Sequence, residues 1–139
     1  MKVNCIFCKI IRGDISAYKV YEDNNVLAFL DIAPVNPGHV LVVPKVHSGN
    51  LDDVDELMLA YLMRAVKRVG KALEKGLGVK GYNVTINNGA VAGQLIDHCH
   101  IHIIPRQPKD GLTPWPQSRY KDDEARKLAA KIKASVVIC

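Results

Sequence analysis

Histidines alternate with apolar residues in one short segment, His98-Cys99-His100-Ile101-His102-Ile103-Ile104. Successive side chains of a β-strand point to opposite faces of the sheet, so this pattern separates the residues into two sets. The three histidines share one face, where successive imidazoles start about 7 Å apart, and the apolar residues between them face the core. The segment therefore predicts a strand that is buried on one side and lined with imidazoles on the other.

The rest of the chain predicts four more strands and three helices. The strand-like runs cover residues 17–22, 26–32, 39–44 and 82–87, and residues 23–25 read as a hairpin turn between the first two. Apolar residues at three- and four-residue intervals from Leu51 onward predict one long helix that ends near Gly76 and Gly78. A short helix is expected between Asn4 and Gly13, and a last one over 122–134. The fold class is α+β: a mainly antiparallel five-stranded sheet with one long helix, a short N-terminal helix and a C-terminal helix.

The length of 139 residues fits one domain, with 48% apolar and 24% charged residues. We expect residues 1–110 to form the main body. A proline-containing tail and the C-terminal helix, 111–139, are expected to belong to the same structural unit.

The composition also bounds the cellular setting. No run approaches the roughly 20 apolar residues that a bilayer requires, and the N-terminus lacks the layout of a signal peptide, so we expect a cytoplasmic protein without a membrane role. The formal charge of +5 suits phosphate-bearing ligands. No basic-aromatic patch is visible, so no direct nucleic-acid role is expected.

The row of histidines has two chemical interpretations. A neutral imidazole is a competent nucleophile near pH 7, and a second imidazole can transfer a proton there, which suits attack on a phosphate. Histidines at alternate strand positions are also typical metal ligands. Spacing alone leaves both interpretations open, and they are compatible.

At this point the sequence resembles a known family. The segment 98–104 is similar to the signature of the histidine-triad (HIT) nucleotide hydrolases and transferases, in which histidines alternate with hydrophobic residues. The resemblance covers roughly residues 4–106, including CIFCKIIRGDI, LAFLDIAPVNPGHVLVVPKVH and GYNVTINNGAVAGQ. It is closest to the Hint-like branch, and there to prokaryotic members with an N-terminal Cys-x-x-Cys.

The resemblance implies roles for four histidines. His100 corresponds to the nucleophile that attacks the α-phosphorus and forms a nucleotidyl-histidine intermediate. His102 corresponds to the residue that contacts the phosphate and helps to protonate the leaving group. His39 corresponds to a fourth active-site histidine that supports the orientation of the nucleophile, and His98 is the first histidine of the triad.

A nucleotide pocket is implied in the same way. Asp31 corresponds to the acid that binds the ribose hydroxyls, for which a carboxylate offers two acceptor oxygens. The apolar walls around the base correspond to Ile6, Phe7, Ile10, Ile15, Phe29 and Ile32. The loop around the phosphate corresponds to Asn87, Gly93 and Gln94, where glycine permits close approach of the backbone.

Cys5-x-x-Cys8 supplies half of a zinc site by its spacing. The resemblance nominates His47 and His98 as the other two ligands. Four such ligands form a closed tetrahedral site, which is structural because no position remains for water. The alternative is that the cysteines are ordinary thiols and that His47 is a surface residue.

The resemblance therefore implies a purine nucleoside phosphoramidase that releases a nucleoside monophosphate, with structural zinc as its cofactor. One alternative is a dinucleoside polyphosphate hydrolase, and another is a non-catalytic nucleotide-binding or scaffold protein. Hint-like proteins are homodimers, so a homodimer is expected here. Trp115 resembles a C-terminal tryptophan of that branch that approaches the partner's active site.

Overall fold

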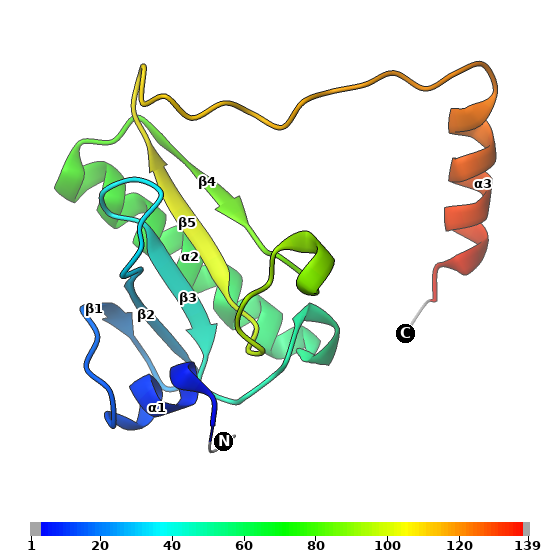
Figure 1. The fold of residues 1–139 in the computed structure, drawn as a ribbon. Coiled ribbons are helices and arrows are strands. Elements are labelled where there is room, and N and C mark those ends of the chain that lie inside the picture. The colour runs from blue at the N-terminus through cyan, green and yellow to red at the C-terminus, as the bar shows by residue number, and fades with distance from the viewer. Residues whose placement is uncertain (1–3, 138–139) are drawn as a thin grey trace.

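The computed structural model describes residues 4–137 and has two helices on opposite faces of one sheet (Figure 1). The elements run in the order α1 (Ile6–Arg12), β1 (Lys19–Glu22), β2 (Val26–Leu30), β3 (Val40–Pro44), α2 (Glu56–Leu77), β4 (Gly81–Thr85), β5 (Ile101–Arg106) and α3 (Glu124–Ser135). Short 3₁₀ turns lie at η1 (Leu51–Asp53) and η2 (Ala90–Ala92). The α+β class expected from the sequence is confirmed.

The five strands form one antiparallel sheet in the order β1-β2-β3-β5-β4. Strand β5 therefore lies inside the sheet, and Leu41 of β3 pairs with His102 while Val42 pairs with Ile101. This register places His102 on the face of Leu41 and Ile101 on the opposite face. The predicted alternation is confirmed for His102 and the core residues of β5, whereas His98 and His100 precede this strand.

Each face of the sheet has its own apolar cluster. Helix α2 packs on one face, and its buried residues meet the side chains of Val40, Val42, Cys99, Ile101 and Ile103. Helix α1 packs on the other face, with Phe7 and Ile10 against Leu27, Phe29 and Leu41. The histidines lie on the side of α1.

Several element boundaries differ from the sequence expectation by a few residues, and three of the differences have a clear local reason. The long helix begins at Glu56 because Asn50 caps the 3₁₀ turn η1 and Asp55 caps α2. Strand β5 begins at Ile101, since the amide of Cys99 donates to the Ser48 carbonyl (2.7 Å) instead of to a neighbouring strand. The last helix begins at Glu124 because Asp122 has a left-handed backbone, φ 37°.

Beyond β5 the chain leaves the sheet. Figure 1 shows the segment after Arg106 running away from the top of β5, with α3 standing apart from the sheet and from α2. Residues 113–122 and the whole of α3 are exposed. Within residues 4–137 no helix combines the length and the apolar character needed to cross a membrane.

Candidate functional site

The ring of His100 is held in place by the carbonyl group of a neighbour. Its side chain is buried, and its Nδ1 lies 2.7 Å from the carbonyl oxygen of His98. A carbonyl only accepts, so Nδ1 carries the proton and Nε2 of the neutral ring keeps its lone pair. The edge of the Phe7 ring packs against this imidazole, with centroids 5.3 Å apart. In its neutral form His100 thus presents the lone pair of Nε2 from a fixed ring.

A chain of hydrogen bonds sets the tautomer of His102. The backbone amide of Val35 donates to Nδ1 of His39 (3.2 Å), so the proton of neutral His39 is on Nε2. That Nε2 donates to Nδ1 of His102 (3.0 Å), which leaves the proton of neutral His102 on its own Nε2. Nε2 of His102 is buried and has no hydrogen-bond partner among the described residues. This nitrogen is therefore a hydrogen-bond donor without an acceptor among the described residues. The rings of His102 and His100 lie next to each other, with their centroids 4.9 Å apart.

Burial keeps both supporting histidines neutral. It lowers the pKa of His102 to about 4, with smaller contributions from His100 and His39, and it also lowers the pKa of His39 against the opposing effect of Asp31. Asp31 Oδ2 lies 3.7 Å from His39 Nδ1, but that nitrogen already accepts from Val35. The pair is therefore a polar contact and not an ion pair. The other oxygen of Asp31 accepts from the amide of Ala33 (2.9 Å).

The six residues expected around a base divide into two groups. Phe7, Ile10 and Phe29 are buried in the cluster beneath α1, and Phe7 contacts His100. Ile6, Ile15 and Ile32 are exposed, by 40%, 37% and 93% of their surface. These three side chains leave apolar surface open to solvent.

The loop before the histidines is braced by its own side chains. Gln94 Oε1 accepts from the amide of Gly89 (2.9 Å), and Gln94 Nε2 donates to the carbonyls of Gly49 (2.6 Å) and Ile96 (3.0 Å). Asn87 Nδ2 donates to the carbonyl of Gly93 (3.3 Å), whose φ of 90° favours glycine. The side chain of Gln94 is thus engaged in hydrogen bonds that shape the loop.

Cys5, Cys8, His47 and His98 form a second cluster, whose ligand atoms all lie within 4.8 Å of one another. Nδ1 of His98 lies 3.3 Å from Cys5 Sγ, 3.7 Å from Cys8 Sγ and 3.2 Å from His47 Nδ1, and Cys8 Sγ lies 3.5 Å from His47 Nδ1. A tetrahedral zinc site places its ligand atoms about 3.3–3.8 Å apart, because the bonds measure about 2.0–2.3 Å. Nε2 of His98 donates to the Pro44 carbonyl (2.9 Å), which leaves Nδ1 as a lone pair for a metal. The four residues fit zinc.

Two backbone groups of the site carry no signal in the sequence. The Val35 amide sets the tautomer of His39, and the His98 carbonyl sets that of His100. His98 therefore has two contacts: its ring lies in the cluster with Cys5, Cys8 and His47, and its carbonyl oxygen accepts from Nδ1 of His100. Trp115 lies in the exposed segment after β5, and 87% of its surface is exposed.

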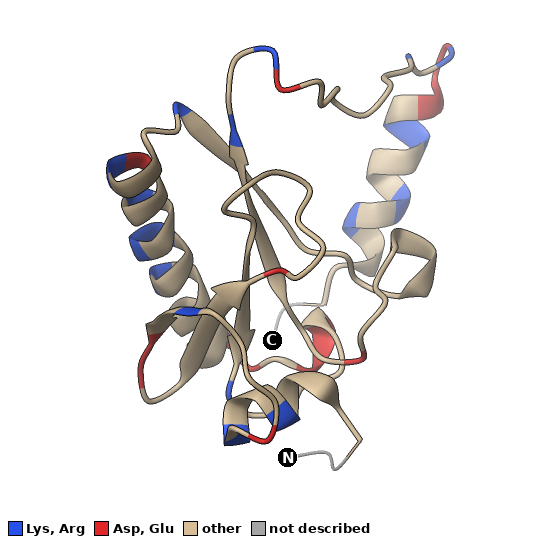
Figure 2. Cartoon of the chain, turned by 60° about the vertical axis from the view of Figure 1, so that its left-hand side comes forward, with Lys and Arg blue, Asp and Glu red and all other residues tan. Residues whose placement is uncertain are grey.

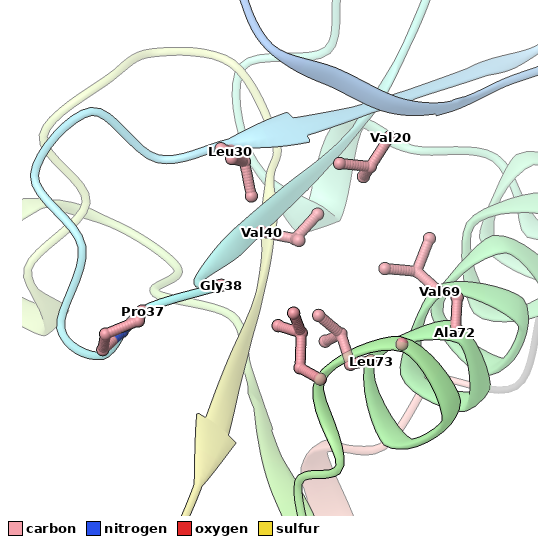
Figure 3. Close-up of a pocket in the computed structure, with 10 residues that line it drawn as sticks. Val20, Leu30, Pro37, Gly38, Val40, Val69, Ala72 and Leu73 are labelled. Carbon is pink, nitrogen blue, oxygen red and sulfur yellow. The ribbon is translucent and has the colours of Figure 1, made fainter.

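A separate groove lies on the face of α2, away from the histidines. It has a volume of about 440 Å³ and is lined mainly by apolar side chains of β1–β3 and α2, including Val20, Leu30, Val40, Val69, Leu73 and Leu77 (Figure 3). It presents no titratable side chain, so it offers no group for phosphate chemistry.

Comparison with known proteins places this geometry in a family. The HIT domain model matches residues 12–109. The adenosine 5′-monophosphoramidase of Schizosaccharomyces pombe is 40% identical over 96% of this chain and 99% of its own. A crystal structure of a HIT family protein from Bacillus subtilis has a TM-score of 0.89 and 40% identity over 98% of this chain and 99% of its own. A zinc-bound histidine triad protein from Mycobacterium smegmatis has a TM-score of 0.76 and 35% identity over 96% and 98%. The chain therefore belongs to the HIT domain family.

Proposed function

We propose that this protein is a nucleotide hydrolase that acts at the α-phosphate through a nucleotidyl-His100 intermediate, and that its substrate is a purine nucleoside phosphoramidate. The observation that carries the proposal is the pair of complementary nitrogens on one face of the sheet. His100 offers a lone pair on Nε2, and His102 offers a buried proton on Nε2 with no partner among the described residues. Nucleophilic substitution at phosphorus needs both groups.

In the first step, the Nε2 lone pair of His100 bonds to the α-phosphorus. The bond from phosphorus to the leaving amine breaks with its electron pair, and the amine takes up a proton from solvent. Neutral His102 keeps its own proton and donates a hydrogen bond from Nε2 to the departing group. The imidazole of His100 becomes positively charged in this step. The carbonyl of His98, which accepts from Nδ1 at 2.7 Å, stabilises that charge.

In the second step, water attacks the same phosphorus and the bond to His100 breaks. His100 recovers its lone pair, the attacking water gives up one proton to solvent, and the nucleoside monophosphate leaves. His100 is thus regenerated after each turnover, and His102 stays neutral throughout. His39 keeps the proton of His102 on Nε2 throughout, because His39 Nε2 donates to His102 Nδ1. The Val35 amide in turn fixes the tautomer of His39 by donating to its Nδ1.

The nucleotide itself is held by groups around this pair. Asp31 Oδ2 is the acceptor for a ribose hydroxyl, and the base lies against the exposed apolar residues Ile6, Ile15 and Ile32 with Phe7 beneath them. The phosphate approaches the loop at Gly93, whose shape Asn87 and Gln94 maintain. The similarity to the adenosine 5′-monophosphoramidase of Schizosaccharomyces pombe supports adenosine as the nucleoside.

Zinc is the proposed structural cofactor, bound by Cys5, Cys8, His47 and His98. It would tie the start of α1 to the end of β3 and to the residue before the nucleophile. The zinc-bound relative supports this assignment. Because all four positions are protein ligands, zinc supplies rigidity here and the histidines supply the chemistry.

The proposed assembly is a cytoplasmic homodimer. Strand β4 lies at one edge of the sheet, and Val84 on that strand and Met63 on α2 are exposed by 39% and 51%. The long helix and this edge would form the shared interface. Sedimentation of the purified protein at several concentrations tests the dimer directly.

The activity is tested by incubating the protein with adenosine 5′-phosphoramidate and measuring the release of AMP. His100→Ala should lower the rate by about a thousandfold or more, because the nucleophile is gone. Cys99→Ala is the matched control, since Cys99 is the preceding residue and faces the opposite side of the sheet. The control should keep its rate, with thermal unfolding measured for both variants.

Other outcomes separate the alternatives. Equal rates for wild type and His100→Ala would contradict the role of His100. Cleavage of diadenosine polyphosphates without phosphoramidate turnover would favour the dinucleoside polyphosphate hydrolase. Binding of AMP without turnover of either substrate would favour a nucleotide-binding or scaffold protein.

A further inference from the structure

Two arginines of α2 border a polar hollow beside the turn between β1 and β2. The hollow has a volume of about 260 Å³ and is lined by Asp23, Asn24 and Asn25 of the turn and by Tyr61, Arg64 and Arg68 of α2. Sites for drug-sized ligands measure roughly 300–1,000 Å³. The hollow therefore suits an ion or a small head group.

This hollow is separate from the histidines and from the sheet edge proposed for the dimer. Helix α2 covers one face of the sheet, whereas the histidines lie on the side of α1. On one flank of α2, Gly70 contacts Tyr82 of β4. On the other flank, Arg68 contacts Tyr21 of β1, and β1 and β4 are opposite edges of the sheet. The hollow lies at the β1 edge and stays accessible when the β4 edge is covered.

Aromatic rings and one hydrogen bond hold both guanidinium groups in place. Arg64 lies over the ring of Tyr61, 4.7 Å from its centroid, and Arg68 lies 5.8 Å from the centroid of the Tyr21 ring. Arg68 Nη1 also donates to the Tyr21 hydroxyl (2.6 Å). A guanidinium that stacks on a ring by its face keeps the N–H donors of its edge available. Two fixed sets of donors therefore border one hollow.

Neither arginine has a carboxylate partner among residues 4–137, where no ion pair involves Arg64 or Arg68. Asp23 also lines the hollow, but its oxygens are occupied. Its Oδ2 accepts from the Tyr21 hydroxyl (2.6 Å), and its Oδ1 accepts from two backbone amides of the turn (2.8 Å each). Like charges one turn apart on a helix repel each other, so an anion between the arginines would relieve this repulsion.

The turn adds neutral donors to the same hollow. The side-chain amides of Asn24 and Asn25 make no hydrogen bond to the described part of the chain, and each amide carries two N–H donors. Figure 2 shows further Lys and Arg bands along α2, which include Lys67 and Lys71. These charges raise the positive potential around the hollow and favour an anion there.

We propose that this hollow binds a phosphate dianion, either free phosphate or the phosphoryl group of a small phosphate monoester. Arg64 and Arg68 would each bind phosphate oxygens through paired N–H···O bonds, and Asn24 and Asn25 would donate to the remaining oxygens. Two guanidinium groups balance the two charges of a phosphate, whereas a carboxylate would balance only one. The inference is independent of the chemistry at His100.

Inorganic phosphate is the probe, titrated into the full chain while backbone and side-chain amide signals are followed by ¹⁵N NMR. The signals of Asn24 and Asn25 should shift with a single Kd. Arg64→Gln should raise that Kd by about tenfold, because one charge-assisted pair of hydrogen bonds is lost. Lys71→Gln is the matched control, since it removes the same charge from the same helix at an exposed position outside the hollow. It should change the Kd by less than about twofold.

Asn24→Asp is the second variant, because it adds a carboxylate to the hollow with almost no change in shape. It should also raise the Kd by about tenfold, and thermal unfolding checks that all variants stay folded. Phosphate at the loop around Gly93 would shift the signals of residues 89–94, so the same spectra separate that site from the hollow. None of these readouts involves AMP release.

Three results would overturn the site: no shift at Asn24 and Asn25, equal effects of Arg64→Gln and Lys71→Gln, or acetate that binds as tightly as phosphate. Ribose 5-phosphate distinguishes the two sources of the ligand. Tighter binding than inorganic phosphate would support a phosphate monoester, and equal or weaker binding would support free phosphate.

Discussion

Main-chain groups around the histidines decide which ring nitrogen of each imidazole carries a proton. The Val35 amide and the His98 carbonyl have fixed polarity, so they set opposite roles for His102 and His100. The identity of a histidine therefore does not determine its role. The alternating pattern in the sequence predicts that the imidazoles share a face. The positions of the backbone groups that decide which ring nitrogen donates and which accepts follow only from the fold.

The tautomer chain predicts a difference between two substitutions of His39. His39→Leu removes the donor to His102 Nδ1, so the proton of His102 is free to move to Nδ1, and kcat for AMP release should fall by about a hundredfold. His39→Gln keeps an N–H near the same place and should retain much more of the rate. Steady-state kinetics decide this, and equal losses in the two variants would show that His39 does not act through its donor.

The cysteine cluster predicts that metal removal affects stability more than it affects the chemistry of His100. Extraction of zinc by a strong chelator should lower the Tm by about 5 °C or more, because the metal joins four separated residues. Cys8→Ser should lose stoichiometric zinc, measured by elemental analysis. Cys99→Ala should keep it, since Cys99 is buried on the other face of the sheet. A Cys8→Ser protein that still holds one zinc per chain would contradict the ligand set.

At the scale of the elements, helix α2 shows what sequence periodicity reveals and what it omits. The apolar stripe predicts the buried face, and Met58, Leu62, Val69 and Leu73 are all buried on it. The stripe does not predict the approach of β4, where the Tyr82 ring packs directly on Gly70. Contacts between elements depend on the register of β4 against β5, which no local pattern encodes.

Two glycines of α2 should respond oppositely to alanine. A Cβ at Gly70 would overlap the ring of Tyr82, so Gly70→Ala should lower the free energy of unfolding by about 1–3 kcal/mol. A Cβ at Gly76 would meet nothing within 4 Å, so Gly76→Ala should raise it by about 0.5–1 kcal/mol through the better helix propensity of alanine. Urea denaturation measures both. A stabilised Gly70→Ala protein would show that β4 does not pack as described.

The order of strands and the departing arm belong to the whole molecule, and the sequence alone predicts neither. Five strands were predicted, but the insertion of β5 between β3 and β4 follows from long-range pairing. That insertion brings His102 opposite Leu41 and within reach of His39. The two residues are 63 positions apart in sequence. The resemblance to the HIT family supplied their roles, and the topology supplies the reason that they meet.

Global stability should depend on pH through the buried imidazoles. The pKa of His102 falls from 6.5 to about 4 on folding, so the unfolded chain binds the proton in this window and the native protein does not. The contribution of His102 is therefore complete above pH 6.5 and is lost as the pH falls toward 4. The slope is about 1.4 kcal/mol per pH unit for one histidine.

His102→Gln isolates this contribution. The variant lacks the titrating ring, so its free energy of unfolding should fall less steeply between pH 6.5 and 4.5 than that of the wild type. Urea denaturation at a series of pH values gives both slopes. Identical slopes would show that His102 titrates alike in the folded and unfolded chains.

The central claim is that the nucleotide passes through His100, and the configuration at phosphorus tests it most directly. The substrate is an adenosine 5′-phosphorothioamidate of one configuration, hydrolysed in ¹⁸O-labelled water, and the configuration of the labelled product is determined by ³¹P NMR. Two displacements, first by His100 and then by water, each invert the centre and predict net retention. Net inversion would mean that water attacks the substrate directly, and it would contradict the nucleotidyl-His100 intermediate.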